Sequence, residues 1–146
     1  MGFTIDNTSM RSVQEDYHQL FTHMLDAFST HEIICDAHGH PVDYRFLAVN
    51  PAFEEMTGLR ATDIIGRRVL EVLPNTEPFW IETFGKVALT GEPSRVKQFS
   101  REIDKTFEVN TFSHKKGHFT CIFKDITLEV KAAAEKKKLQ EQLLHS

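Results

Sequence analysis

The chain has 146 residues, of which 40% are hydrophobic, with two cysteines and a net charge of -4. This length suits one domain that buries about 70% of its unfolded surface, and a second independent domain does not fit. Charges of both signs are scattered, so no basic stripe neutralises phosphates, and nucleic acid is not an expected partner. Apolar runs fall far short of the ~20 residues that span a bilayer, and the N-terminus has no signal-peptide pattern. We therefore expect a cytoplasmic protein without membrane contact.

The first part of the chain predicts a lead-in followed by an amphipathic helix, together residues 1–29. Residues 1–12 show no clear period, whereas apolar residues between positions 13 and 28 recur at spacings of three and four. These residues are Tyr17, Leu20, Phe21, Met24, Leu25 and Phe28. Such a helix needs a surface to cover.

A hairpin feeding a short helix is predicted next. Residues 32–36 and 44–49 are typical of antiparallel strands, and the turn between them contains Gly39 and Pro41. Asn50 can cap a helix with its side-chain oxygen, Pro51 suits the first helical position, and Gly58 can adopt the left-handed stop. We therefore expect a sharply bounded helix at 51–57.

Two further short helical pieces are predicted, at 62–65 and 69–73, followed by a longer helix. Thr76 can cap the longer helix, Pro78 suits its first turn, and Gly91 ends it. Its apolar residues share one face, which we expect to lie opposite a sheet. They are Trp80, Phe84, Val87 and Ala88.

Three more strands are predicted around residues 95–101, 106–113 and 118–126, and residues 115–117 form the turn between the last two. The expected fold is therefore α+β. It has an antiparallel sheet of about five strands, with helices inserted between strands two and three and flanking N-terminal and C-terminal helices.

The end of the chain, residues 128–146, has many lysines and glutamates. Leu128, Ala132, Leu139 and Leu143 lie on one stripe, which Glu135 interrupts. This imperfect heptad seam can pair in parallel with a second copy of the chain. A single solvated helix is the alternative.

Several motifs together resemble a PAS domain, over residues 31–127. They are the run from Asn50 to Gly58, the segment from Asp63 to Arg67, Phe107 to Val109, Lys116 with Gly117, and Asp125 to Thr127. The resemblance implies a PAS-like core at 30–127, with residues 128–146 as a signalling linker helix. It also implies a sensory module of a larger two-component or similar protein, such as a histidine kinase or a cyclic-dinucleotide enzyme. A homodimer and an output domain are the expected partners.

The resemblance also implies that the chain could bind a cofactor. Similar haem-binding proteins ligate iron through a histidine on the long helix, and residues 77–90 contain none; the Asn-Cys-Arg-Phe-Leu string of light-sensing members is also absent. We therefore argue against haem of that type and covalent flavin chemistry. Non-covalent flavin, haem held from another position and a small organic ligand stay possible. The cofactor is unknown. The histidines considered lack metal-ligand spacing, and Cys35 and Cys121 are expected to be buried thiols, so we expect no metal site.

Pocket candidates follow from strand parity. Phe119, Cys121 and Phe123 share the face that points inward in similar proteins, and Trp80 and Phe84 lie on the opposing helix. On the preceding strand, the hydrophobic pattern favours Phe107, Val109 and Thr111 inside, whereas the resemblance favours Glu108 and Asn110. We select Glu108 and Asn110, because a few polar groups in an apolar pocket are typical of a ligand site.

The resemblance implies that Asp125 and Thr127 anchor the last strand and pass a signal to Leu128 and the helix beyond. Arg67 or Arg68 is the expected partner of Asp125. The expected dimer interface combines Tyr17, Leu20, Phe21 and Met24 with Leu139 and Leu143.

Two other functions stay open. One is a ligand-free PAS dimer scaffold. The other is a small α+β enzyme with an enclosed pocket, in which Glu108 is the one interior acid or base that we can name. No catalytic motif supports the enzyme, so we expect no catalytic residue in this chain.

Overall fold

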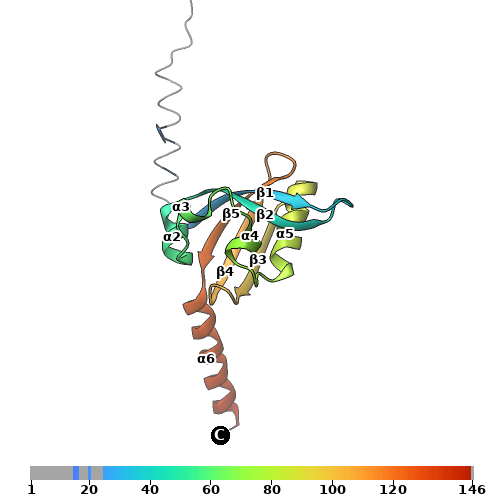
Figure 1. Cartoon of the computed structure of the whole chain (residues 1–146). Coiled ribbons are helices and arrows are strands. Elements are labelled where there is room, and N and C mark those ends of the chain that lie inside the picture. Colours follow the sequence, from blue (N-terminus) through green and yellow to red (C-terminus); the bar gives the residue numbers. More distant parts are fainter. Residues whose placement is uncertain (1–14, 17–19, 21–24, 146) are drawn as a thin grey trace, which may run out of the picture.

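The computed structural model describes residues 15, 16, 20 and 25–145 (Figure 1). It forms one five-stranded antiparallel sheet with the strand order β2-β1-β5-β4-β3. The strands are β1 (Ala27–Cys35), β2 (Pro41–Val49), β3 (Ser94–Ser100), β4 (Lys105–Phe112) and β5 (His118–Asp125). The helices are α2 (Pro51–Thr57), α3 (Ala61–Ile64), α4 (Val69–Val72), α5 (Pro78–Thr90) and α6 (Thr127–Leu144). The predicted α+β fold, with helices between strands two and three, is confirmed.

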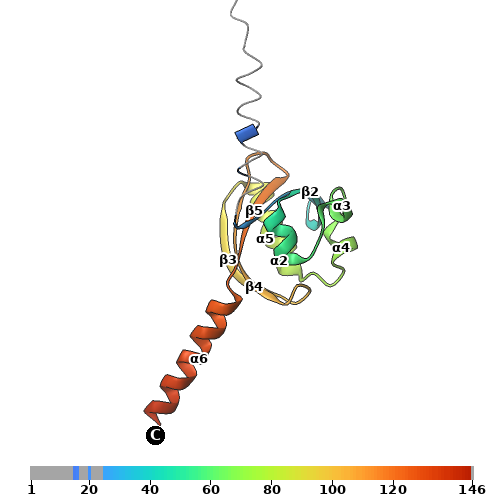
Figure 2. The same cartoon turned by 90° about the vertical axis from the view of Figure 1, so that its left-hand side faces the viewer.

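One face of the sheet forms the core together with α5, which lies on the concave side of the sheet (Figure 2). On β1 the buried residues alternate with more exposed ones, so that Ser29, His31 and Ile33 share the inward face. The register places Ser29 opposite Cys121 and His31 opposite Phe119 on β5. Period-two alternation therefore determines which side chains meet the helices.

The side chain of Asn50 fixes the start of α2. Its Oδ1 accepts hydrogen bonds from the backbone N–H of Phe53 at 3.0 Å and of Phe28 at 2.9 Å. Its Nδ2 donates to the carbonyl of Asp26 at 3.1 Å. Gly58 ends the helix with a φ of 77°. The predicted helix is confirmed, and the cap also ties α2 to the start of β1.

Helix α5 packs very closely on the sheet. A Cβ atom at Gly85 would lie only 2.3 Å from Cγ of Pro41, so that only glycine allows this approach. The predicted buried face of α5 is confirmed. The predicted cap at Thr76 is wrong: Glu77 occupies the N-cap position, and the Thr76 hydroxyl donates instead to the carbonyl of Leu73 at 2.7 Å.

The boundary between the N-terminal segment and the sheet differs from the prediction. Strand β1 begins at Ala27, so Phe28 belongs to the sheet rather than to a helix. The hydrogen bond from Phe28 to the Asn50 side chain holds it there. Leu20 is 69% exposed, whereas Tyr17, Phe21 and Met24 lie outside the described residues.

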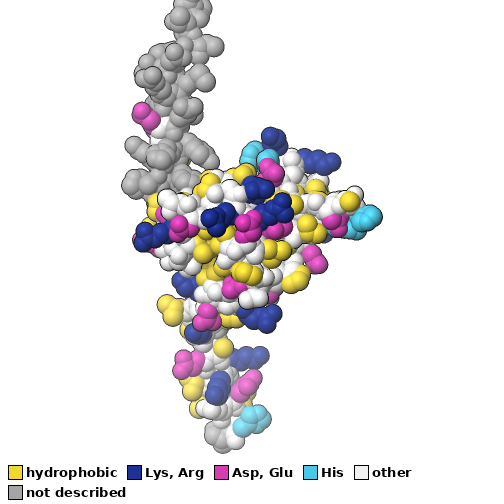
Figure 3. Space-filling view, viewed as in Figure 1, with side chains coloured by type: hydrophobic (Ala, Val, Ile, Leu, Met, Phe, Trp, Pro, Cys, Tyr) yellow, Lys and Arg dark blue, Asp and Glu magenta, His cyan; other side chains and the backbone are white. Residues whose placement is uncertain are grey.

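Helix α6 projects from the end of β5 and buries none of its residues (Figures 1 and 3). Leu128 is 80% exposed and Leu139 is 56% exposed, and Leu143 is also exposed. The helix is confirmed, and its pairing with a second copy stays a prediction. Within the described part of the chain, no helix has the length and apolar character needed to cross a membrane.

Candidate functional site

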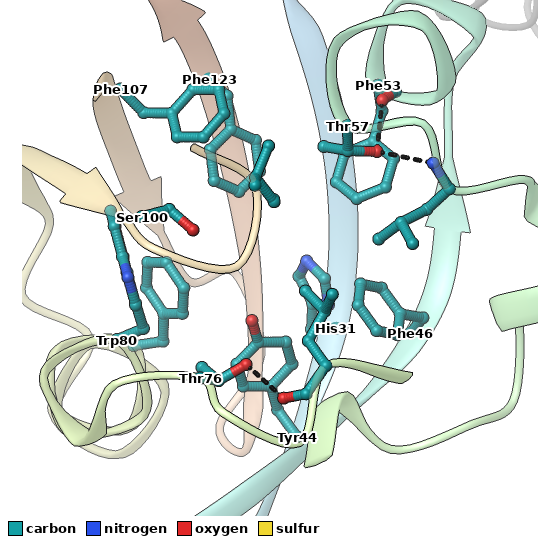
Figure 4. Close-up of a pocket in the computed structure, with 14 residues that line it drawn as sticks. His31, Tyr44, Phe46, Phe53, Thr57, Thr76, Trp80, Ser100, Phe107 and Phe123 are labelled. Carbon is teal, nitrogen blue, oxygen red and sulfur yellow. Dashed lines mark hydrogen bonds between the residues drawn. The ribbon is translucent and has the colours of Figure 1, made fainter. Parts of the chain in front are cut away.

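A cavity lies between the inward face of the sheet and the helices (Figure 4). The volume that the centres of water molecules can occupy in this cavity is about 50 Å³. This is room for roughly four waters. Its lining comes from two helices, α2 and α5, from all five strands and from the intervening loops. The lining residues are His31, Tyr44, Phe46, Phe53, Thr57, Leu59, Leu73, Thr76, Trp80, Phe84, Ser100, Ile103, Phe107 and Phe123.

His31 is the one lining residue of a titratable type near neutral pH, and it is held uncharged. It is 2% exposed, and burial lowers the pKa of its imidazole from 6.5 to about 3, although the Arg45 backbone offsets part of this effect. Since the remaining lining side chains are apolar, hydroxyl-bearing or indole, the whole lining is neutral at physiological pH.

The surroundings of His31 fix its ring firmly. Its Nε2 is hydrogen-bonded to the Ser29 hydroxyl at 2.7 Å, and its ring stacks on Phe119 with centroids 4.7 Å apart. Tyr44 and Phe46 meet it edge-on. Within the described residues its Nδ1 makes no hydrogen bond. Sequence reasoning missed His31, because the predicted strand began at residue 32; its two-residue spacing from Ile33 was the signal that would have placed it inside.

Two hydroxyl groups point into the cavity, from Tyr44 on β2 and Ser100 at the end of β3 (Figure 4). In the described part of the chain neither hydroxyl makes a hydrogen bond. Burial raises the pKa of Tyr44, so its phenol stays protonated and can donate. By contrast, the hydroxyls of Thr57 and Thr76 donate to backbone carbonyls at 2.7 Å.

Three of the predicted pocket residues, Trp80, Phe84 and Phe123, lie in the cavity wall. Phe119 and Cys121 share the inward face but lie behind the lining, fully buried. The Sγ atom of Cys121 lies 3.6 Å from the Thr111 hydroxyl, and burial raises the pKa of the thiol. Cys121 is therefore a protonated core thiol and not an exposed nucleophile.

The prediction that Glu108 and Asn110 point into the cavity is wrong. Phe107, Val109 and Thr111 are the buried residues of β4, as the hydrophobic pattern alone indicated. Glu108 instead accepts a hydrogen bond from Nε of Arg95 at 2.7 Å, and this contact lowers the pKa of its carboxyl. Asn110 is exposed. An unpaired carboxylate inside an apolar core is costly, whereas the outer face supplies Arg95 as a partner. The enzyme alternative thereby loses the interior acid or base on which it depended.

The predicted anchor at the end of the sheet has a defined geometry. Oδ1 of Asp125 accepts hydrogen bonds from the backbone N–H of Thr127 at 2.9 Å and from its hydroxyl at 2.6 Å. The Thr127 hydroxyl in turn accepts from the backbone N–H of Thr106 on β4, at 2.9 Å. Partial burial alone would raise the pKa of Asp125, but the hydrogen bonds from Thr127 and the charge of Lys105 outweigh it and lower the pKa.

Lys105, and not an arginine, is the basic partner at this junction. Its Nζ lies 3.9 Å from Oδ2 of Asp125 and donates a hydrogen bond of 2.7 Å to the carbonyl of Met56 in α2. The predicted role of Arg67 and Arg68 is wrong. The Gly66 turn pairs their segment with β2, since Phe46 N–H donates to the Arg67 carbonyl and Arg45 bridges to Arg68. Strand β2 is the edge strand furthest from β3, and β1 and β5 separate it from β4.

Metal binding finds no support in the described residues, where no group of three or more His, Cys, Asp or Glu side chains could hold an ion.

Comparison with known proteins finds one family model and several solved structures that match the chain. A family model described as "PAS domain" matches residues 15–89. The PAS domain of an HTR-like protein from Haloarcula marismortui matches with a TM-score of 0.57 and 17% identity, over 82% of this chain and 97% of that one. A domain of a sensory box sensor histidine kinase/response regulator from Geobacter sulfurreducens matches with a TM-score of 0.54 and 23% identity, over 80% and 96%. An RNA-binding light-oxygen-voltage receptor matches with a TM-score of 0.60 and 15% identity, over 97% of this chain and 40% of that one. At these identities the likeness shows the fold alone. Among curated proteins none matches.

Proposed function

Because the chain belongs to the PAS domain family, we propose that it is the sensory and dimerisation module of a larger signalling protein in the cytoplasm. A histidine kinase or a cyclic-dinucleotide enzyme is the proposed type of output. In this proposal residues 30–127 form the core, residues 1–29 and 128–146 flank it, and the chain works as a homodimer. A small ligand in the cavity, or contact with a partner, changes the core, and α6 carries that change onward.

The junction around Lys105 is the observation that carries this proposal. Helix α2 contributes Phe53 and Thr57 to the cavity wall, and its Met56 carbonyl accepts the hydrogen bond from Lys105. Lys105 also faces Asp125, which holds the first residue of α6. In this proposal a shift of α2 caused by a ligand reaches α6 through three consecutive polar contacts: Met56 to Lys105, Lys105 to Asp125, and Asp125 to Thr127. Chains of polar contacts of this kind can carry energetic coupling between two sites.

Lys105→Met is expected to loosen the start of α6 more than it destabilises the domain. The variant keeps most of the aliphatic side chain but removes the hydrogen bond to Met56 and the charge facing Asp125. Loss of about 1 kcal/mol locally corresponds to roughly fivefold faster amide exchange at residues 126–130. Hydrogen exchange read by NMR measures this, and urea unfolding measures the global change, which we expect to be smaller than about 1 kcal/mol because both charges are partly solvated.

Lys124→Met is the matched control, because Lys124 lies exposed on the outer face of β5. Asp125→Ala removes both hydrogen bonds to Thr127 and should give a larger local effect in the same residues. If Lys105→Met lowers global stability and leaves exchange at residues 126–130 at the wild-type rate, Lys105 is only a structural contact and the route is refuted.

Leu139→Lys is expected to weaken the proposed dimer. Leu139 is half exposed on a helix that buries none of its residues. In the proposed dimer this side chain packs against α6 of the second copy. A lysine from each chain on the seam opposes association, and we expect the dissociation constant to rise on the order of tenfold. Analytical ultracentrifugation measures it. Gln140→Lys adds the same charge one position away, about a hundred degrees round the helix, and serves as the control. Equal sedimentation of all three proteins would remove the seam from the proposal.

A ligand-free dimer scaffold is the second candidate, and the small size of the cavity favours it. Native mass spectrometry of the freshly purified protein, compared with the denatured protein, separates the two. A dimer that carries an extra small mass supports sensing, whereas a dimer without any retained mass supports the scaffold. A monomer without ligand would contradict the dimerisation role in both.

A further inference from the structure

We propose that the cavity selects a small, neutral, planar molecule that carries a hydrogen-bond acceptor, of the order of one aromatic ring with a carbonyl-type substituent. The hydroxyl of Tyr44 donates to that acceptor, and the hydroxyl of Ser100 is the second polar contact. This inference rests on the proposed sensory function and gives it a ligand class. Four properties of the described cavity support it: its charge, its walls, its free polar groups and its size.

The charge of the lining selects a neutral ligand. Of the fourteen lining residues none carries a formal charge at neutral pH, because His31 is the sole titratable one near that pH and burial keeps its imidazole neutral. The nearby lysine, Lys105, is engaged with the Met56 carbonyl and Asp125. Moving an anion or a cation into such a site without a partner costs several kcal/mol. Phosphates and carboxylates are therefore poor ligands for it.

The walls favour a flat ring. Trp80 and Phe84 have centroids 5.7 Å apart on α5, and Phe107 and Phe123 have centroids 5.9 Å apart on the sheet. Phe53 completes this side, 6.0 Å from Phe123. At these distances the rings of each pair contact one another, and the faces and edges that they turn to the cavity can meet a further ring in an offset or edge-on arrangement. The small volume limits the ligand to about one ring unless the cavity expands.

The unpaired polar groups determine which ligand atoms are recognised. The hydroxyls of Tyr44 and Ser100 point into the open centre of the cavity (Figure 4), and neither is paired within the described residues. Among the other polar lining groups, Thr57 and Thr76 bond to backbone carbonyls, and Trp80 Nε1 donates to Glu77. His31 Nδ1 is a further lining atom without a hydrogen-bond partner in the described residues. A phenol that faces the cavity without a protein partner favours a ligand that supplies an acceptor.

Three probes of similar size test the proposal: acetophenone, which has the ring and a carbonyl; ethylbenzene, which lacks the acceptor; and benzoate, which is an anion. The chain contains one tryptophan, Trp80, and it lines the cavity, so its indole N–H resonance reports binding in NMR titrations. We expect acetophenone to bind about fivefold more tightly than ethylbenzene. Benzoate should bind on the order of tenfold more weakly than acetophenone, or not at all.

Tyr44→Phe removes one hydroxyl and keeps the ring, and Ser100→Ala removes the other. Tyr44→Phe should reduce acetophenone affinity about fivefold and leave ethylbenzene affinity unchanged; Ser100→Ala should give a smaller loss in the same direction. Asn110→Ala, exposed on the outer face, is the control and should change neither. Thermal unfolding of each variant confirms that the fold is kept.

The outcomes separate the ligand class from the sensory function. Benzoate binding as tightly as acetophenone, equal losses for acetophenone and ethylbenzene in Tyr44→Phe, or no response of Trp80 to any probe would each overturn the ligand class. A retained ligand in native mass spectrometry would leave the sensory function standing in those cases. Acetophenone binding without any change in exchange at residues 126–130 would support the ligand class and contradict transmission to α6.

Discussion

Asn50→Ala is expected to lower the free energy of unfolding by about 3 kcal/mol. The side chain of Asn50 is fully buried and makes three hydrogen bonds, to Phe53, Phe28 and Asp26. Loss of a helix cap of this kind costs about 1 kcal/mol, and each further buried hydrogen bond contributes a similar amount. The effect is large because one amide joins the first turn of α2 to the start of β1.

Urea unfolding of the wild-type protein and the variant measures this change. Asn110→Ala makes the same substitution at an exposed site and should change stability by less than about 0.5 kcal/mol. Asn50→Asp keeps the acceptor oxygen but removes the amide N–H that donates to the Asp26 carbonyl. We therefore expect this variant to lose a large part of its free energy of unfolding as well. A loss below about 1 kcal/mol in Asn50→Ala would mean that water replaces the amide, and the argument from three buried hydrogen bonds would fail.

Acidification from pH 7 to pH 5 is expected to cost about 2 kcal/mol of stability through His31 alone. The pKa of its imidazole is about 3 in the folded protein and 6.5 in the unfolded chain. Between these values the unfolded chain binds a proton that the folded protein does not, so stability falls as the pH falls, by at most about 1.4 kcal/mol per pH unit. The contribution is fully present above pH 6.5 and disappears progressively toward pH 3.

His31→Gln isolates this contribution, because glutamine does not titrate. The variant should be less stable at pH 7, where a packed ring is lost, but its stability should change less between pH 7 and pH 5 than that of the wild-type protein. Urea unfolding at both pH values measures how much stability each protein loses between pH 7 and pH 5. We expect the wild-type protein to lose about 2 kcal/mol more than the variant. Parallel pH dependences would show that the His31 imidazole is not held neutral by burial.

Local chemistry explains what the sequence could predict. The cap at Asn50 and the stops at Gly58 and Gly91 depend on the conformations of single residues, and the structure has all three. The order of strands and helices followed from periodicity and turn residues for the same reason. The hydrophobic pattern also indicated the correct face of β4.

Long-range pairing explains what the sequence could not predict. Lys105 and Met56 are 49 positions apart, and only the assembled sheet brings the lysine to that carbonyl and to Asp125. The family resemblance predicted Arg67 or Arg68 as the partner of Asp125, but backbone hydrogen bonds of Gly66 and Arg67 hold that segment on β2. The Ser100 hydroxyl reaches the cavity from the last residue of β3, just before the turn at residues 101–104. Such contacts depend on register and chain path, which short patterns do not encode.

Helix α6 has a mechanical consequence that follows from its lack of buried residues. Its 18 residues extend about 27 Å, and Thr127 ties the first of them to Asp125 and to Thr106 on β4. If this helix tilts as one rigid body about Thr127, a tilt of about 10° would displace its far end by about 5 Å. In the proposed signalling role, a small change in the core would thus become a displacement at the tip about as large as one turn of a helix.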